Sequence, residues 1–419
     1  MSRYLSLYYG SLDAARAARL LGAALAPFGE ADDRLGDAVR QFQGGGDVFG
    51  YSSARGALAG LLRAAGVGPG DEVLLSAFTC LAVPTAVISV GATPVYVDVD
   101  AGTMNVPAAA LVAAMGPRVR AVVVQHTMGS VADIGPVLTA ARARGILTIE
   151  DGALSLGTTV NGRPIGRTGD AAVFSMEMSK TISTGWGGVL VVNSPPLAAA
   201  MRDVYAATPR RRLGLRARDV LQTAISGFCY QRQLFAFGRY LVAAAFRTGL
   251  FRPSTTAAEE AGRPASDFVA RLGRAQAMLA AVQWRRLDDV ARHSSANMDA
   301  LRQALKAAGF VTLGDPVNGE RQVSPRIAFL VPDRAATIAW FAGEGVEVGS
   351  WFDGPLSPPP SSAAFAYDAA KFPVACQLAR NIVNLPTHVG IDAADMARMI
   401  ALIKRYAEVL AGDRQRAIA

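Results

Sequence analysis

Between residues 71 and 194, short β-branched runs alternate with stretches rich in alanine and leucine. The runs are DEVLLS, TPVYVDVD, RAVVVQHT, ILTIED, AAVFSM and GVLVVNS. The alanine-rich stretches predict helices at 55–66, 80–90, 107–115 and 134–144. Strands that alternate with helices favour parallel neighbours, so this pattern predicts a mostly parallel sheet covered by helices. The last two runs follow each other closely, as in hairpin-linked strands.

A different pattern begins after about residue 280. It predicts a helix at 285–309, a strand at SPRIAFLVP, a helix near 334–344, a strand at VEVGSWF and a final helix from about 392. A chain of 419 residues exceeds what one core usually fills. We therefore expect a large α/β domain over 1–265 and a smaller α+β domain over 266–419.

Cysteine usage and charge exclude several classes of function. Three cysteines without metal-ligand spacing predict neither a zinc site nor disulfides, and the N-terminus lacks a signal-peptide pattern, so we expect a cytoplasmic protein. The net charge is +8, and residues 210–252 account for all of it with nine arginines and one acidic residue, Asp219. The rest of the chain is near neutral, so nucleic acid is not an expected partner.

The basic segment 210–252 is also rich in aromatic and aliphatic residues. Arg232 and Arg239 interrupt it, so it is not expected to cross a bilayer as one helix. Its composition fits an amphipathic element at an anionic lipid surface, which would hold the protein at the inner face of the membrane. A helical excursion packed on a dimer partner is equally compatible with the sequence.

Polar residues follow the predicted strands. They are Gln125, His126, Glu150, Asp151, Ser175 and Lys180. Ligands of open parallel sheets bind beyond the carboxyl ends of the strands, so these side chains are expected to share one site. Taken singly, an aspartate at a strand end is commonly a helix N-cap and a lysine is commonly solvated. Only the combination indicates chemistry.

That combination matches the needs of a pyridine cofactor that activates amino acids. Such a cofactor needs a lysine amine for a Schiff base and a carboxylate that keeps its ring nitrogen protonated. Its phosphate needs backbone N–H groups at the start of a helix. The stretch YSSARGALAGLL supplies such a start, with Ser52 and Ser53 before a helical run and Arg55 able to bind phosphate oxygens. A capped helix with a solvated arginine is the alternative for this stretch.

The motifs, in this order, resemble the DegT/DnrJ/EryC1/StrS family of fold type I sugar aminotransferases, which depend on pyridoxal phosphate. SSARGAL is similar to the family's Ser-Gly-Thr-Ala-Ala-Leu turn, and QHTMGSVADI to its His-x-x-Gly-x-x-x-Asp segment. EDGALSLG is similar to Glu-Asp-Ala-Ala-Gln, and GRPIGRTGDAAVFSMEMSK to the stretch that reaches the Schiff-base lysine. The resemblance covers about 51–194, with weaker similarity near 270–279 and 384–388.

The resemblance implies a fold and residue roles. The fold would be a large domain with a mostly parallel seven-stranded sheet between helices, plus the smaller C-terminal domain. Asp151 would hold the pyridinium nitrogen, and Lys180 would form the Schiff base and shuttle a proton. Phosphate contacts are implied for Ser175 and for the backbone of Ala54 and Arg55, and Ser53 is a further expected cofactor-binding residue. The protein would be a homodimer.

Several positions depart from the family pattern. Cys80 stands where an aromatic ring usually stacks on the cofactor, and Leu154 where a Gln or His meets its phenolic oxygen. Arg55 replaces the usual Thr, and Trp186 replaces the Glu of a Gly-Glu-Gly-Gly turn. The substrate contacts implied by the resemblance are His126, Trp186 and His388.

The expected activity is transfer of an amino group from an amino acid, glutamate by family analogy, to a keto group of a nucleotide-linked sugar. Such a step belongs to polysaccharide or amino-sugar biosynthesis. One alternative is an aminotransferase for a non-sugar or lipid-linked ketone at the membrane surface. Another is a non-catalytic regulatory protein that binds pyridoxal phosphate. Retention of Lys180 and Asp151 favours an enzyme.

Overall fold

The central element is a seven-stranded sheet with the order β1-β10-β9-β6-β5-β2-β4. The computed structural model describes residues 5–7, 28–231, 234–263, 267–317 and 319–418. The strands are β1 (Asp47–Tyr51), β2 (Glu72–Ser76), β4 (Thr93–Val97), β5 (Val119–Gln125), β6 (Leu147–Asp151), β9 (Ala171–Ser175) and β10 (Gly188–Val192). Only β10 runs against its neighbours, β9 and β1, so the predicted mostly parallel sheet is confirmed.

All six strands predicted between 71 and 194 are present. The seventh, β1, escaped the sequence analysis because it is a single five-residue run, DVFGY, that follows three glycines. It pairs antiparallel with β10 at the edge of the sheet. This pairing brings the end of β1 beside the start of β10, and the helix that follows β1 begins at the same place.

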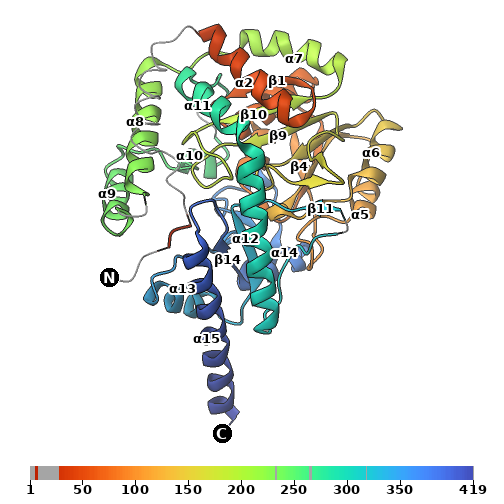
Figure 1. Cartoon of the computed structure of the whole chain (residues 1–419). Helices are drawn as coiled ribbons and strands as arrows, with labels where there is room; N and C mark the ends of the chain where they lie inside the picture. The colour runs from red at the N-terminus through yellow and green to blue at the C-terminus, as the bar shows by residue number, and fades with distance from the viewer. Residues whose placement is uncertain (1–4, 8–27, 232–233, 264–266, 318, 419) are drawn as a thin grey trace.

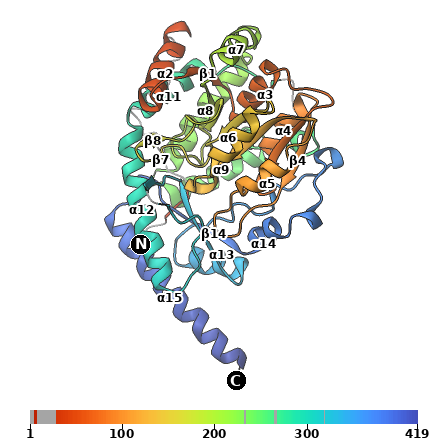
Figure 2. The same cartoon turned by 90° about the vertical axis from the view of Figure 1, so that its right-hand side faces the viewer.

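Helices cover both faces of the sheet (Figures 1 and 2). The helices are α2 (Phe28–Gln43), α3 (Ala54–Ala64), α4 (Ala82–Ser89), α5 (Ala108–Ala113), α6 (Ile134–Arg142), α7 (Pro195–Ala207) and α11 (Arg274–Arg285). Side chains alternate between faces along a strand. In β10, Leu190 and Val192 accordingly join the core beneath α3 and α7, whereas Val189 and Val191 join the core beneath α2 and α11.

The C-terminal part has its own core, formed by helices on a two-stranded antiparallel sheet. Its elements are α12 (Leu287–Ala307), β12 (Arg326–Leu330), α13 (Arg334–Gly343), β14 (Ile382–Pro386) and α15 (Ala393–Ile418). The buried residues of α14 (Pro373–Asn381) instead join the core of the seven-stranded sheet. The predicted helices and the strand at SPRIAFLVP are therefore present. A short strand, β13 (Leu356–Ser357), pairs with β3 (Thr79–Cys80) of the large sheet's connections.

The strand predicted at VEVGSWF is wrong. This segment makes only isolated bridges, from Val346 to Leu5 and from Gly349 to Asn384. Beyond Gly349, the side chain of Asn384 takes the place of a backbone partner. It accepts from the Trp351 N–H at 2.8 Å and donates to the Trp351 carbonyl at 2.9 Å. The ladder therefore stops before Trp351.

Two helices, α8 (Leu213–Cys229) and α9 (Phe235–Arg247), occupy most of the basic segment 210–252, and the short α10 (Ala257–Glu260) follows. Figure 1 shows α8 and α9 at the edge of the molecule, on the side away from α5 and α6. Among the described residues, no helix has both the length and the apolar character needed to cross a membrane.

Candidate active site

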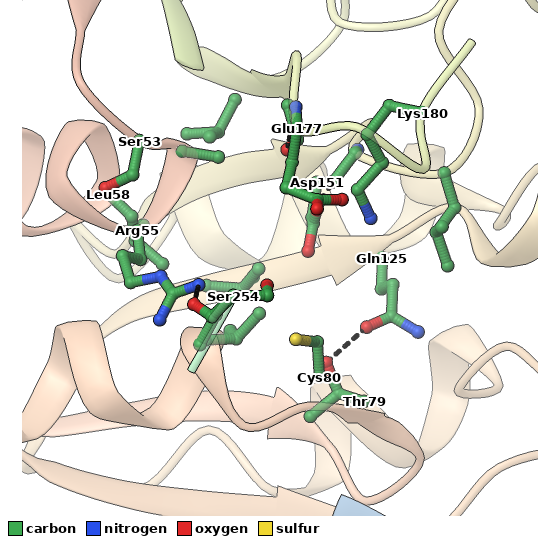
Figure 3. A pocket seen from close by; sticks show the side chains of 18 of the residues that line it. Ser53, Arg55, Leu58, Thr79, Cys80, Gln125, Asp151, Glu177, Lys180 and Ser254 are labelled. Atoms are coloured by element: carbon green, nitrogen blue, oxygen red, sulfur yellow. Dashed lines mark hydrogen bonds between the residues drawn. The ribbon is translucent and has the colours of Figure 1, made fainter. Parts of the chain in front are cut away.

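A pocket of about 910 Å³, including the part open to solvent, lies where several elements meet. It is lined by residues at the carboxyl ends of β5, β6 and β9, at the start of α3, and at the start of β10. Figure 3 shows Asp151 and Lys180 in this pocket, with Ser53 and Arg55 at one end and Cys80 and Thr79 across from them. The structure therefore gathers the predicted strand-end residues around one space.

Asp151 is the last residue of β6, and its carboxylate lies in the pocket. Its Oδ1 accepts a hydrogen bond from the Ala153 N–H at 2.9 Å. Exclusion of water raises the pKa of Asp151, and the Ala153 N–H and the charge of Lys180 offset part of that rise. A cationic ring nitrogen placed beside Asp151 would stabilise its ionised form.

Lys180 lies in the loop between β9 and β10. Its backbone N–H donates to the Glu177 carbonyl, and its Nζ lies 4.3 Å from the centroid of the Trp351 ring. Burial lowers the pKa of Lys180, against the opposing charge of Glu177. A lowered pKa increases the fraction of neutral amine, which is the nucleophilic form. Trp351 was not predicted to belong to the site, because its segment, VEVGSWF, has the composition of a strand.

The start of α3 forms one end of the pocket. Ser53 is its N-cap and accepts from the Gly56 N–H at 3.1 Å. The N–H groups of Ala54 and Arg55 have no hydrogen-bond partner in the described part of the chain. A Cβ on Gly188 would lie 2.3 Å from the Ala54 nitrogen, so only glycine lets β10 pack this closely against the start of α3. Backbone donors without a partner, at a helix start that lines the pocket, fit a phosphate group.

The guanidinium of Arg55, predicted to bind phosphate, is engaged elsewhere. It pairs with Glu259 at 2.9 Å and donates to the Ser254 carbonyl at 2.5 Å. The side chains of Arg55 and Glu259 are 9% and 2% exposed, so the ion pair is nearly buried. The sequence analysis did not identify Glu259 because it lies 204 residues from its partner.

Cys80 and Leu154, which stand where the family pattern has an aromatic residue and a Gln or His, both line the pocket. Cys80 ends the short strand β3, which β13 holds by backbone pairing. Ser175 ends β9, lines the pocket and accepts from the Glu177 N–H at 3.4 Å. Trp186 lines the pocket as predicted, and the guanidinium carbon of Arg252 lies 5.2 Å from its ring centroid.

The two histidines predicted to contact substrate are held by the fold. His126 is 1% exposed, with Nε2 3.0 Å from Glu150 and Nδ1 accepting from the Ala132 N–H. Both of its ring nitrogens are thus occupied by protein atoms. His388 lies outside the pocket lining, and its Nε2 is 2.8 Å from the Ser6 carbonyl. Burial lowers the pKa of His388 to about 4. Its predicted substrate contact is not supported.

Glu150 explains why His126 is fixed. Its carboxylate also accepts from the backbone N–H groups of Gly166, Thr168 and Gly169, at 2.7–2.8 Å. Burial alone would raise the pKa of Glu150, but the hydrogen bond and charge of His126 and these N–H groups together lower it. Glu150 therefore supports the floor of the pocket, while its neighbour Asp151 faces the pocket.

The sequence and the fold were compared with those of known proteins. The DegT/DnrJ/EryC1/StrS aminotransferase family matches residues 12–236 and 243–404. Protein MosB of Rhizobium meliloti is 40% identical over 166 residues, which cover 40% of this chain and 33% of MosB. The GDP-perosamine synthase of Caulobacter vibrioides is 44% identical over 141 residues, which cover 34% of this chain and 38% of that enzyme. The chain thus spans about a third of MosB and less than two fifths of the synthase.

Solved structures share the fold over nearly the whole chain. The putative sugar aminotransferase Spr1654 from Streptococcus pneumoniae has a TM-score of 0.76 and 18% identity, covering 98% of this chain and 100% of that one. DesV from S. venezuelae has a TM-score of 0.72 and 23% identity, covering 94% of each chain. The fold is thus the predicted fold type I α/β fold. With the family matched over most of its length, the chain belongs to the DegT/DnrJ/EryC1/StrS aminotransferase family.

Proposed function

We propose that this protein is a pyridoxal phosphate-dependent aminotransferase that moves an amino group from an amino acid, glutamate, to a keto group of a nucleotide-linked sugar. The observation that carries the proposal is that one pocket holds Lys180, Asp151 and the open amides of α3 (Figure 3). Two relatives, the GDP-perosamine synthase and a UDP-N-acetyl-3-dehydro-alpha-D-glucosamine 3-aminotransferase, support the choice of a nucleotide-sugar acceptor.

Each part of the pocket has a task in this proposal. When bound, pyridoxal phosphate supplies an electron sink for negative charge on the substrate carbon. Asp151 would hold a proton on the ring nitrogen, and the amides of Ala54 and Arg55 would bind the phosphate. Lys180 would attach the cofactor covalently and would carry a proton between the substrate carbon that bears the nitrogen and the cofactor carbon on the other side of that nitrogen. The side chains of Cys80 and Leu154 would pack against the ring.

The test is covalent trapping. Purified protein reconstituted with pyridoxal phosphate should be yellow, and borohydride should fix the cofactor on Lys180, as read by mass spectrometry. Lys180→Ala should lose the adduct, whereas Lys371→Ala, at a lysine whose side chain is 73% exposed, should retain it. A colourless protein that cannot be reconstituted would refute the proposed activity.

The donor is tested separately with half-reactions. Glutamate should bleach the absorbance band of the bound cofactor. Glutamine is the necessary comparison, because one relative is the L-glutamine:scyllo-inosose aminotransferase of Streptomyces griseus, 41% identical over 155 residues. If the half-reaction is faster with glutamine, glutamine becomes the proposed donor and the rest of the mechanism is unchanged.

A lipid-linked or otherwise hydrophobic ketone is the second candidate acceptor. It is favoured by the continuity of the basic segment with the pocket, since Ser254 lines the pocket seven residues after α9 ends. We also propose a cytoplasmic homodimer, on the basis of the family resemblance. Light scattering coupled to gel filtration would measure the mass, and a monomer at working concentration would refute the dimer.

A further inference from the structure

Helix α8 has its polar face turned inwards. Asp219, Gln222, Thr223 and Ser226 are buried against the body of the protein. The Thr223 hydroxyl is 3.1 Å from the Thr184 carbonyl, in the loop after Lys180, and the Gln222 amide donates to the Arg252 carbonyl at 3.0 Å. Surface helices of water-soluble proteins normally bury their apolar face. The inversion leaves the apolar side of α8 facing away from the protein.

The exposed side of α8 and α9 carries large apolar residues. Nine of the thirteen large hydrophobic residues that are exposed in the described chain lie between 213 and 250. The most exposed are Leu213 at 72%, Phe237 at 70%, Tyr240 at 59% and Phe228 at 53%. The other four are valines elsewhere in the chain. Such a concentration of exposed aromatic and leucine side chains on one pair of helices is typical of an interaction site.

The charge of the same surface has one sign. The only acidic residue of 210–252, Asp219, is buried in an ion pair with Arg211 at 2.5 Å. Arg212 and Arg247 are exposed and form no ion pair with any carboxylate that the structure describes. The exposed apolar residues are therefore accompanied by positive charge that no acidic side chain of the segment neutralises.

We propose that this outer face, defined by Leu213, Leu221, Phe228, Phe237, Tyr240 and Leu241, binds an anionic lipid surface. Apolar side chains would enter the boundary between headgroups and acyl chains, and the arginines would meet lipid phosphates. A two-fold contact between two copies is disfavoured by charge, because it would bring arginine-rich surfaces together with no exposed acid to pair them.

Docking would orient the candidate active site towards the lipid. The chain leaves α9, returns through Arg252 beside Trp186, and reaches the pocket wall at Ser254. A membrane bound to α8 and α9 would therefore lie next to the segment that forms this wall. The binding itself does not depend on the proposed transamination, because it uses none of the pocket residues.

The experiment measures binding of the full-length protein to vesicles of phosphatidylcholine, with or without phosphatidylglycerol, by flotation. Binding to the phosphatidylglycerol vesicles is expected, and Phe228→Gln/Phe237→Gln/Leu241→Gln should weaken it more than about tenfold. Arg212→Gln/Arg247→Gln should weaken it about 25-fold at low salt, since each arginine near an anionic surface contributes about fivefold. The matched control, Val311→Gln/Val317→Gln, alters exposed apolar residues elsewhere and should bind like the wild type.

Three results would overturn the proposal. They are failure of the wild-type protein to bind phosphatidylglycerol vesicles, equal binding to neutral vesicles, and equal binding of the wild type and the triple variant. Light scattering of the same proteins without lipid provides a further arm. A halved mass in the triple variant, with an unchanged circular dichroism spectrum, would identify the face as a subunit interface and also overturn the proposal.

Discussion

Gly188→Ala tests the link between β10 and the start of α3. A Cβ at this position would lie 2.3 Å from the Ala54 nitrogen and 2.5 Å from both Ala54 Cα and the Ser53 carbonyl carbon. Ordinary contacts begin at 3.4 Å, so the closest approach is 1.1 Å too short. All three atoms are backbone, and β10 is fixed by pairing with Tyr51 and Ser175. Because no side chain can rotate away, we expect the variant to lose about 3 kcal/mol of unfolding free energy.

Urea denaturation of the cofactor-free protein measures this loss, and titration with pyridoxal phosphate measures the second consequence. Separation of β10 from α3 would move the amides proposed to bind phosphate, so the cofactor should bind more weakly. The control is Gly116→Ala, whose Cβ would meet nothing within 4 Å and whose φ is not positive. It should change stability by no more than about 0.5 kcal/mol. Unchanged stability and cofactor affinity in Gly188→Ala would refute the reasoning.

Three further predictions concern buried charges. Glu150→Gln should cost about 3 kcal/mol in urea denaturation at neutral pH, because three backbone N–H groups and His126 lose a carboxylate. The pKa of Glu150 is lower in the folded protein than in the unfolded chain, so its ionised form stabilises the fold. The stability difference between wild type and Glu150→Gln should therefore persist above pH 4.5 and shrink as the pH falls through the folded-state pKa. A difference that stays constant with pH would contradict this prediction. Arg55→Gln and Glu259→Gln should each lower the free energy of unfolding by about 3 kcal/mol, because each leaves a buried charge without its partner. The double variant should lose less than the sum of the two single losses, and strictly additive losses would show that the two residues are not coupled. Asp151→Asn should fold normally but slow the cofactor half-reaction by about a hundredfold, and a wild-type rate would remove Asp151 from the mechanism.

The strands and the main site residues could be predicted from sequence because both follow local patterns. β6 and β9 are short buried runs with β-branched or aromatic residues, and their last residues, Asp151 and Ser175, reach the same edge of a parallel sheet. Neighbouring residues of a strand point to opposite faces of the sheet, so only one of Glu150 and Asp151 can face the pocket. Which of the two it is cannot be decided until the faces of the sheet are known. The substrate contact of His126 was implied by the family resemblance; His126 does line the pocket, but its pairing with Glu150 could not be predicted without knowing the face of each residue.

The incorrect predictions depend on contacts between distant segments. VEVGSWF has the composition of a strand, but the Asn384 side chain binds the backbone of Trp351 and ends the pairing. The Arg55 guanidinium is paired with Glu259, which lies 204 residues away in the sequence, beyond the basic segment. The orientation of α8 likewise depends on polar contacts such as that of Thr223 with the Thr184 carbonyl. Periodicity cannot supply these pairings.

The departures from the family pattern are physically connected through the basic segment. Arg252 lies over the ring of Trp186, which replaces the usual glutamate. Glu259 neutralises Arg55, which replaces the usual threonine. Asp267 accepts hydrogen bonds from Arg211, at the other end of the segment, and lies 3.6 Å from Arg252.

Through these contacts the segment packs directly against residues of the pocket wall, such as Trp186. Arg55 without Glu259 would be a nearly buried, unpaired charge, which is strongly destabilising. Removal of the segment from 210 to 260 is therefore expected to disturb the pocket as well as lipid binding. Substitutions on the outer face of α8 and α9 leave Arg252, Ser254 and Glu259 in place. Such substitutions, unlike the deletion, can therefore test lipid binding without changing the active site.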